Sequence, residues 1–293
     1  MNLTAQNEYG KIEEIAIKSI PDGFVNQAEI DQQWNDLGYL FRPDFPKAIQ
    51  EYQDFYSIIA SSASKIHALP RHASTGIDSI YCRDASIITD HGVILCNMGK
   101  ASRSGEPKAQ GAYFEAKSIP ILGKIAAPGL LEGGDTAWID QQTLAVGIGY
   151  RTNYEGATQL QALLDPFGIQ VRSFDLPHYN GPQDVFHLMS IFSPVDKDLA
   201  VAYSPLMPVA FRQLLINNGY QFVEVPSEEF ESMGCNVLAL APRQCLMVEG
   251  NPLTEKLLRA AGCEVIIYEG QHISIAGGGG PTCLTRPILR KVG

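Results

Sequence analysis

The chain has 293 residues, of which 45% are hydrophobic and 18% are charged, a composition typical of a globular protein with a sizeable core. Its formal net charge of −10 argues against nucleic acid or an anionic membrane as the main partner. No apolar run approaches the roughly 20 residues of a membrane-spanning helix. The N-terminal segment lacks the basic and then apolar pattern of a secretory signal, so we expect a cytoplasmic protein.

The six cysteines are scattered, without a C-x-x-C pair or the Cys/His spacing of a zinc site. In a cytoplasmic protein they are expected to be reduced, and most of them to be small buried apolar residues. At most one or two are expected to be reactive. The sequence contains no convincing site for a metal or an organic cofactor.

The first predicted element is a strand at residues 11–20, which belongs to the least regular of several repeated units. A longer helical insertion is predicted next, at residues 31–66. We expect its first part, residues 31–45, to form a lid over the functional site.

Four β-hairpins are predicted after the insertion, each with β-branched residues on both sides of a short polar turn. Three of them lead into a helix and a closing strand, with the helix ends marked by Asn153, by proline and by glycine. The hairpins span residues 79–97, 130–149, 185–203 and 235–248, the helices residues 154–164, 208–217 and 252–261, and the closing strands residues 169–174, 221–225 and 264–269.

One polar or reactive residue interrupts each of these units at a similar place. Asp84, Asp135, His187, Asn236 and Cys283 follow one another at spacings of 51, 52, 49 and 47 residues. Repeats that close around an axis bring equivalent positions together at the centre. No Pro/Ser-rich linker divides the chain, so the sequence predicts one α/β domain over residues 1–293.

Cys283 follows four consecutive glycines at residues 277–280. A lone cysteine is ordinarily a buried structural thiol. Glycines, however, let a backbone approach a ligand closely and offer N–H groups to a developing charge, which favours a nucleophile. His187 lies in an apolar segment, where a histidine is more often a core residue. Only a position next to Cys283 would make it an acid/base group.

Several charged residues also have two interpretations. Glu132 lies beside two leucines and two glycines, and a carboxylate buried there needs a cationic partner. Arg83 and Asp84 form either a local ion pair or part of a site. Arg103 and Arg151 are either surface residues or the groups that bind a substrate carboxylate through paired hydrogen bonds.

Five short motifs occur in order: R-D at 83–84, E-G-G-D at 132–135, H-L at 187–188, M-G-C-N-V-L at 233–238 and G-G-G-G-P-T-C at 277–283. Together they resemble the guanidino-group-modifying enzymes, which include arginine deiminase, agmatine deiminase, glycine amidinotransferase and dimethylarginine dimethylaminohydrolase. The resemblance spans roughly residues 8–290. It implies a five-bladed α/β propeller (the pentein fold), a small guanidino substrate as partner, and no metal or cofactor.

The resemblance also implies catalytic roles. Cys283 looks like the nucleophile, His187 like the general acid/base, and Glu132 like the partner of this histidine and of the guanidinium. The implied reaction hydrolyses a guanidino carbon through a covalent thiouronium intermediate and gives a ureido product such as citrulline.

Five further residues are implied to bind substrate. Asp84 resembles a guanidinium ligand, and Arg103 and Arg151 resemble the arginines that hold the substrate α-carboxylate. Asp135 and Asn236 complete this set.

The subfamily prediction depends mainly on two positions. Residues 187–190, H-L-M-S, resemble the H-L-K-[ST] of dimethylarginine hydrolases, whereas deiminases and amidinotransferases typically read H-x-D. Met189 would suit an apolar wall beside a methylated nitrogen. Arg83, in contrast, stands where dimethylarginine hydrolases typically have an acid. We therefore expect hydrolysis of a methylated arginine. Arginine deimination or dihydrolysis, amidino transfer and a non-catalytic binding module are the alternatives, and a homo-oligomer is left open.

Overall fold

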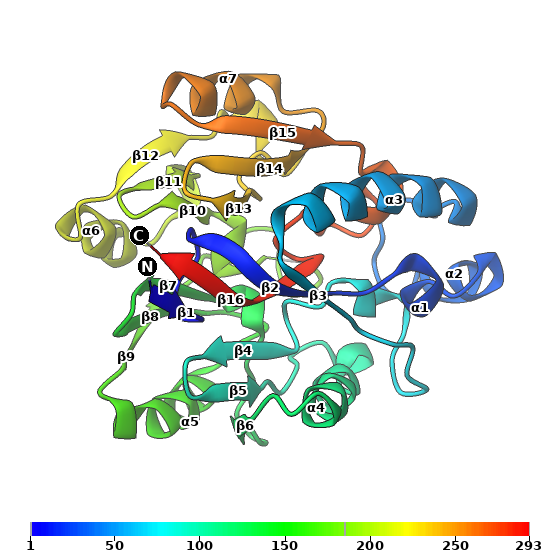
Figure 1. Ribbon diagram of the computed structural model, residues 1–293, viewed down its shortest axis with the longest axis horizontal. Coiled ribbons are helices and arrows are strands. Elements are labelled where there is room, and N and C mark those ends of the chain that lie inside the picture. Colours follow the sequence, from blue (N-terminus) through cyan, green and yellow to red (C-terminus); the bar gives the residue numbers. More distant parts are fainter. Residues whose placement is uncertain (1, 185, 293) are drawn as a thin grey trace.

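The computed structural model describes residues 2–184 and 186–292. Within these ranges the chain forms an α/β fold of five separate small β-sheets and seven α-helices (Figure 1). Val185, the first residue of one predicted hairpin, lies outside the described residues. No helix in the two described ranges is long and apolar enough to cross a membrane.

Four of the sheets share one connectivity. Two consecutive strands pair antiparallel, an α-helix follows, and a third strand pairs parallel with the second. The helix supplies the crossover that a parallel pair requires. These units are β4 (Ser86–Thr89), β5 (Gly92–Leu95), α4 (Glu106–Ala116) and β6 (Ile121–Lys124); β7 (Thr136–Asp140), β8 (Thr143–Ile148), α5 (Tyr154–Leu164) and β9 (Gln170–Asp175); β10 (Phe192–Asp196), β11 (Leu199–Ala202), α6 (Val209–Asn217) and β12 (Gln221–Glu224); and β13 (Leu238–Ala241), β14 (Gln244–Val248), α7 (Pro252–Ala260) and β15 (Glu264–Tyr268).

The fifth sheet joins the two ends of the chain, which lie close together in Figure 1. β2 (Lys11–Ile17) pairs antiparallel with β16 (Thr285–Val292) and parallel with β3 (Lys65–Ala68). β1 (Asn2–Thr4) adds an edge strand beside β16. The C-terminal strand therefore takes the place that the first hairpin strand has in the other sheets. This explains why the opening unit looked irregular in the sequence.

The predicted helical insertion is the enlarged crossover of this fifth unit. This crossover lies between β2 and β3 and contains α1 (Ile20–Gly23), α2 (Gln27–Gln33) and α3 (Phe45–Ser62), so its helices begin before the predicted residue 31. Helical structure ends at residue 62 instead of the predicted 66, because the following residues pair with β2 as β3. Figure 1 shows α3 beside the segment that leads into β16.

The three predicted helices are confirmed, and α5 has the predicted bounds. The side chain of Asn153 begins α5 by accepting a hydrogen bond of 2.8 Å from the Gly156 N–H. α4 was not predicted, because Pro107 and Gly111 weaken its helical signal. Gly111 is needed for packing, since a Cβ there would lie 2.7 Å from Leu95 Cδ1.

Three predicted hairpins begin six or seven residues too early in the sequence, including the one predicted from residue 130, whose first strand β7 starts at Thr136. β4 starts at Ser86 and β10 at Phe192, and the residues before them form turns, including 3₁₀ turns at Ile77–Ile80 and Leu188–Ser190. The predicted strand around His187 is therefore wrong. The polar residues of the fifty-residue period lie just before the first strand of their sheets, where a turn can direct a side chain away from the sheet.

Candidate active site

The glycines of two motifs are required by close packing around the reactive side chains. A Cβ at Gly280 would lie 2.6 Å from the Asn236 side chain. A Cβ at Gly134 would lie 2.6 Å from His187 Nδ1 and 2.7 Å from Asp84 Oδ1. Contacts under 3.0 Å are not tolerated, so glycine at both positions lets these turns come together. Backbones that approach this closely are a common reason for glycine in a turn.

Cys283 lies two residues before the start of β16 and is the one cysteine among the six that is not fully buried. Asn236 Nδ2 donates a hydrogen bond of 3.3 Å to its sulfur, and Asn236 Oδ1 accepts one of 3.1 Å from the Thr282 N–H. Burial raises the pKa of the Cys283 thiol, and the Asp84 carboxylate raises it further. The thiol is therefore expected to be protonated until a cation lies beside it.

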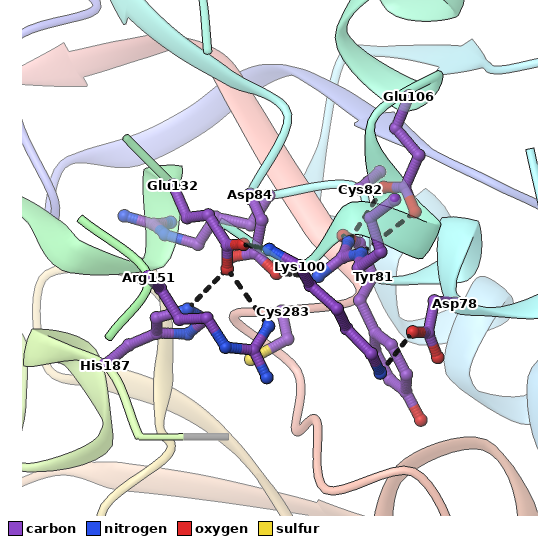
Figure 2. A network of polar contacts seen from close by, with 12 residues as sticks. Asp78, Tyr81, Cys82, Asp84, Lys100, Glu106, Glu132, Arg151, His187 and Cys283 are labelled. Atoms are coloured by element: carbon purple, nitrogen blue, oxygen red, sulfur yellow. Dashed lines mark hydrogen bonds and ion pairs between the residues drawn. The ribbon is translucent and has the colours of Figure 1, made fainter. Parts of the chain in front are cut away.

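His187 and Glu132 form a buried pair, with His187 Nε2 at 2.8 Å from Glu132 Oε2 (Figure 2). Burial by itself lowers the pKa of His187, but the carboxylates of Asp135, Asp84 and Glu132 outweigh it and raise this pKa to about 9. Burial alone would raise the pKa of Glu132, yet His187 and Arg151 hold it below its usual value. The pair is thus an imidazolium and a carboxylate at neutral pH.

Asp135 orients this pair from outside the cavity. Its Oδ2 accepts a hydrogen bond of 2.7 Å from Thr152 Oγ1, and its Oδ1 accepts one of 3.1 Å from the Leu188 N–H. Thr152 Oγ1 in turn accepts from the Glu132 N–H at 3.1 Å. In the described part of the chain Asp135 does not line the cavity that holds Cys283. Its position differs from that of a substrate ligand because the turn after His187 uses its carboxylate.

Asp84 and Arg103 form a second buried pair. Arg103 Nη1 donates to Asp84 Oδ2 at 2.5 Å, and its Nε and Nη2 donate to Glu106 at 2.9 and 2.8 Å. Its Nη2 also donates to the Tyr81 carbonyl at 2.8 Å. Arg103 is therefore held largely by the protein itself. The other oxygen, Asp84 Oδ1, is buried and has no hydrogen-bond partner among the described residues.

Arg151 and Lys100 complete the charged groups of the site. Arg151 Nη1 lies 3.6 Å from Glu132 Oε2, and its Nη2 donates to the Asp184 carbonyl at 3.4 Å. Lys100 Nζ donates to Asp78 Oδ2 at 2.7 Å (Figure 2). Lys100 and Asp78 were not predicted as site residues. Neither stands in one of the five motifs, and a lone lysine or aspartate carries no distinguishing signal.

One cavity brings these groups together, and its volume is about 20 Å³. That is room for about one water-sized sphere, so a guanidino compound can enter only if a neighbouring segment moves. Among the described residues the lining comprises Asp78, Tyr81, Asp84, Lys100, Arg103, Arg151, His187, Gly277, Gly278, Gly279 and Cys283. Asn236 lies behind the thiol and lines a neighbouring cavity of about 150 Å³.

Met189 lies away from the cavity, whereas the predicted lid at residues 31–45 contacts the site. Met189 is buried in an apolar cluster with Leu188 and Phe192, and within the described residues it does not line the cavity. It therefore does not form the apolar wall that the sequence suggested. The predicted lid does contact the site, because the Leu37 carbonyl accepts from Lys100 Nζ at 2.7 Å and the Leu40 N–H donates to the Ala276 carbonyl at 2.7 Å.

A metal could be considered at Asp84, Glu132 and His187, whose ligand atoms lie within 4.8 Å of one another. These atoms are already used in ion pairs, since His187 Nε2 bonds to Glu132 and Arg103 bonds to Asp84. The positive charges of His187 and Arg103, each paired with one of these carboxylates, would repel a metal ion. The arrangement is better suited to an organic cation that can donate hydrogen bonds.

Comparison with known proteins identifies the family of the chain. The sequence model of the family described as "N,N dimethylarginine dimethylhydrolase, eukaryotic" matches residues 28–290. The chain belongs to this family. It is, with that family, a hydrolase of C–N bonds in linear amidines and acts on guanidino groups. The expected membership in the guanidino-group-modifying superfamily is thereby confirmed.

Individual relatives are distant. The dimethylarginine dimethylaminohydrolase of Pseudomonas aeruginosa is 24% identical, over 82% of this chain and 89% of its own length. An arginine deiminase of Mycoplasma capricolum is also 24% identical, over 92% of this chain and 76% of its own length.

Two solved structures share the fold. The dimethylarginine dimethylaminohydrolase of P. aeruginosa, solved with citrulline, has a TM-score of 0.75 at 21% identity and covers 94% of this chain and 98% of its own. The N-terminal domain of a cyanobacterial arginine dihydrolase, solved with its product, has a TM-score of 0.79 at 18% identity and covers 94% and 96%.

Proposed function

We propose that this protein hydrolyses the guanidino carbon of a methylated arginine to citrulline and an amine, with Cys283 as nucleophile. The observation that carries the proposal is the unpaired, buried Oδ1 atom of Asp84, a residue that lines the same cavity as Cys283 and His187. A buried acceptor without a partner is costly, and the N–H groups of a guanidinium would satisfy it. Bound there, the guanidino carbon would face the thiol.

In the first half of the proposed reaction, the bound guanidinium favours the thiolate because its positive charge offsets the effect of Asp84 on the Cys283 pKa, and the thiol proton passes to solvent. The sulfur attacks the guanidino carbon and a C–S bond forms. The imidazolium of His187 gives its proton to the departing nitrogen, and the C–N bond breaks. The products of this half are a free amine and a covalent thiouronium on Cys283.

In the second half, the neutral His187 takes a proton from water, and the hydroxide attacks the thiouronium carbon. The tetrahedral species collapses as its hydroxyl proton passes to solvent, the C–S bond breaks, and the Cys283 thiolate leaves as the neutral ureido product forms. Glu132 stabilises the imidazolium in both halves through its 2.8 Å contact. We propose Asp135 and Asn236 as positioning residues, for the histidine turn and for the sulfur.

Arg103 and Arg151 are assigned different roles, because their hydrogen bonds within the protein differ. Arg151 keeps the proposed role of holding the substrate carboxylate, because its described contacts are long, at 3.6 and 3.4 Å. Arg103 is better suited to orienting Asp84, because its Nε, Nη1 and Nη2 atoms all donate to protein acceptors.

Arginine dihydrolysis or deimination is the second candidate, favoured by the likeness to the cyanobacterial arginine dihydrolase fold and by the inward packing of Met189. A non-catalytic binding module would not need a thiol beside a buried acid and an imidazolium.

We also propose that the five sheets are the blades of a five-bladed propeller, that residues 1–293 are one catalytic domain and that the protein is cytoplasmic. Whether it forms a homo-oligomer can be measured by light scattering.

The test is product formation from dimethylarginine, monomethylarginine, arginine and agmatine, each with wild type and the Cys283→Ser variant. We expect citrulline from the methylated substrates, abolished by the substitution. The Cys263→Ser variant is the matched control, because Cys263 is buried in another sheet region and should not affect turnover. Turnover of arginine alone would favour the dihydrolase or deiminase, and no turnover of any compound would reject the proposal.

A further inference from the structure

Lys100 is the one lysine among the described residues that line the Cys283 cavity. Its ammonium group donates to the Leu37 carbonyl and to Asp78 Oδ2, both at 2.7 Å. Its backbone N–H donates to Glu132 Oε1 at 3.0 Å. One residue thus connects the predicted lid segment, a cavity carboxylate and the partner of the catalytic histidine.

The two acceptors that Lys100 occupies have the chemistry of an ammonium-binding site. A carboxylate and a backbone carbonyl offer lone pairs and no donors, which suits a group with three N–H donors. The carboxylate of Asp78 is buried, with a side-chain exposure of 7%. A ligand ammonium would compete with Lys100 for Asp78 Oδ2 and the Leu37 carbonyl and would meet a like charge, which is repulsive in a buried site.

The donors that remain in this part of the cavity suit an anion. Lys100 uses two of its three N–H groups in the described contacts, which leaves one. Arg151 also lines the cavity, and its contacts with Glu132 and the Asp184 carbonyl are long. A lysine and an arginine that line the same cavity can bind a carboxylate through charge-assisted hydrogen bonds.

We propose that Lys100 makes this part of the cavity a carboxylate site that disfavours a free α-ammonium group. The preferred substrates are then methylated guanidino acids whose α-amine is absent or blocked, such as Nα-acylated or deaminated derivatives, and methylated arginine with a free α-amine binds more weakly. This inference rests on the proposed binding of a guanidinium at Asp84 and concerns the other end of the same substrate. The reaction at the guanidino carbon is unchanged, and the product is the corresponding ureido acid.

The experiment separates binding from turnover. The dissociation constants of arginine and Nα-acetylarginine are measured by calorimetry on the Cys283→Ser protein, which cannot form the covalent intermediate. We expect Nα-acetylarginine to bind at least about tenfold tighter than arginine. Adding Lys100→Met should remove most of this preference, because Asp78 and the Leu37 carbonyl become free for the ligand ammonium. Lys108→Met, on the exposed side of α4, is the matched control and should leave the preference unchanged.

Tighter binding of arginine to the protein that retains Lys100, or no binding of either ligand, would overturn the inference. An equal loss of both ligands in the Lys100→Met protein would also overturn it, since that result assigns Lys100 a structural role only. Hydrolysis of dimethylarginine and of its Nα-acetyl form by wild type tests the proposed function separately. Absent turnover with the binding preference intact rejects the hydrolase proposal alone, whereas turnover that favours the free amine rejects the Lys100 inference alone.

Discussion

His187 Nε2 lies 2.8 Å from Glu132 Oε2, and the two side chains are only 4% and 0% exposed. Water does not solvate either charge when the side chains are this deeply buried, so each charge is stabilised by the other. The proximity of Asp135 and Asp84 raises the His187 pKa further. The histidine is thereby kept protonated at neutral pH, as a general acid for a departing amine must be.

The Glu132→Gln variant tests this dependence. The amide keeps the size of the side chain but removes the charge, so the His187 pKa should fall and less imidazolium should be present at neutral pH. We expect kcat to decrease about 100-fold or more, with the alkaline limb of the pH–rate profile moved to lower pH. Glu14→Gln is the matched control, because Glu14 pairs with His67 at the same 2.8 Å distance in another sheet. A profile that keeps its alkaline limb would contradict the assignment.

The raised pKa of His187 also predicts how stability changes with pH. The folded-state pKa is about 9 against 6.5 for an ordinary histidine, so folding favours the protonated form. This contribution is fully present below pH 6.5 and is lost as pH rises through about 9. It amounts to roughly 1.4 kcal/mol for each unit of pKa difference. Thermal unfolding at pH 6.5 and 9.5 should show a smaller loss of stability for His187→Asn than for wild type. Equal losses would mean that this histidine is not charged in the folded protein.

Much of the fold could be predicted from sequence, because the strands are short, β-branched and separated by turns, and the helix ends carry local caps such as Asn153. The positions of the functional side chains relative to those strands could not be predicted from the sequence. His187 and Asp84 lie in turns that precede β10 and β4, and these turns are stabilised by distant partners. One example is the Leu188 N–H, which donates to Asp135 fifty-three residues away in the chain.

The residues of the candidate site also divide into those that could be predicted from the sequence and those that could not. Motif residues such as Cys283 and Asp84 could be identified because they stand out from their apolar or glycine-rich surroundings. Lys100 and Asp78 could not be identified, because only the folded chain brings the Lys100 ammonium group to the Asp78 carboxylate and the Leu37 carbonyl. The internal bonds of Arg103 were equally invisible, because Glu106 and the Tyr81 carbonyl become its partners only in the folded chain.

Asn236 is expected to control the reactivity of Cys283. Its Nδ2 donates to the sulfur at 3.3 Å, and this hydrogen bond favours the thiolate. The Asn236→Ala variant should raise the Cys283 pKa, slow alkylation by iodoacetamide at pH 8 about tenfold, and lower kcat. Asn218→Ala, at the exposed end of α6, serves as the control. An unchanged alkylation rate would show that the contact does not affect the thiol.

Glu51 links the helical insertion to the segment that carries the nucleophile. From α3 its Oε2 accepts hydrogen bonds from the His272 and Ile273 N–H groups, at 2.8 and 3.1 Å, in the turn just before the glycine run. The Glu51→Ala variant leaves these two donors without their partner, and we expect a stability loss of about 1–3 kcal/mol. Because the glycine run then loses its support, kcat should fall as well.

Glu51→Gln is the matched variant for this test, because an amide oxygen can still accept from the two N–H groups. It should restore most of the stability and the activity, since the need is for an acceptor and not for a charge. Unfolding in urea and kcat are measured for both variants. If Glu51→Ala loses stability while kcat stays at the wild-type value, α3 supports the fold without holding Cys283 in place. If both fall together and the glutamine restores both, the insertion positions the nucleophile.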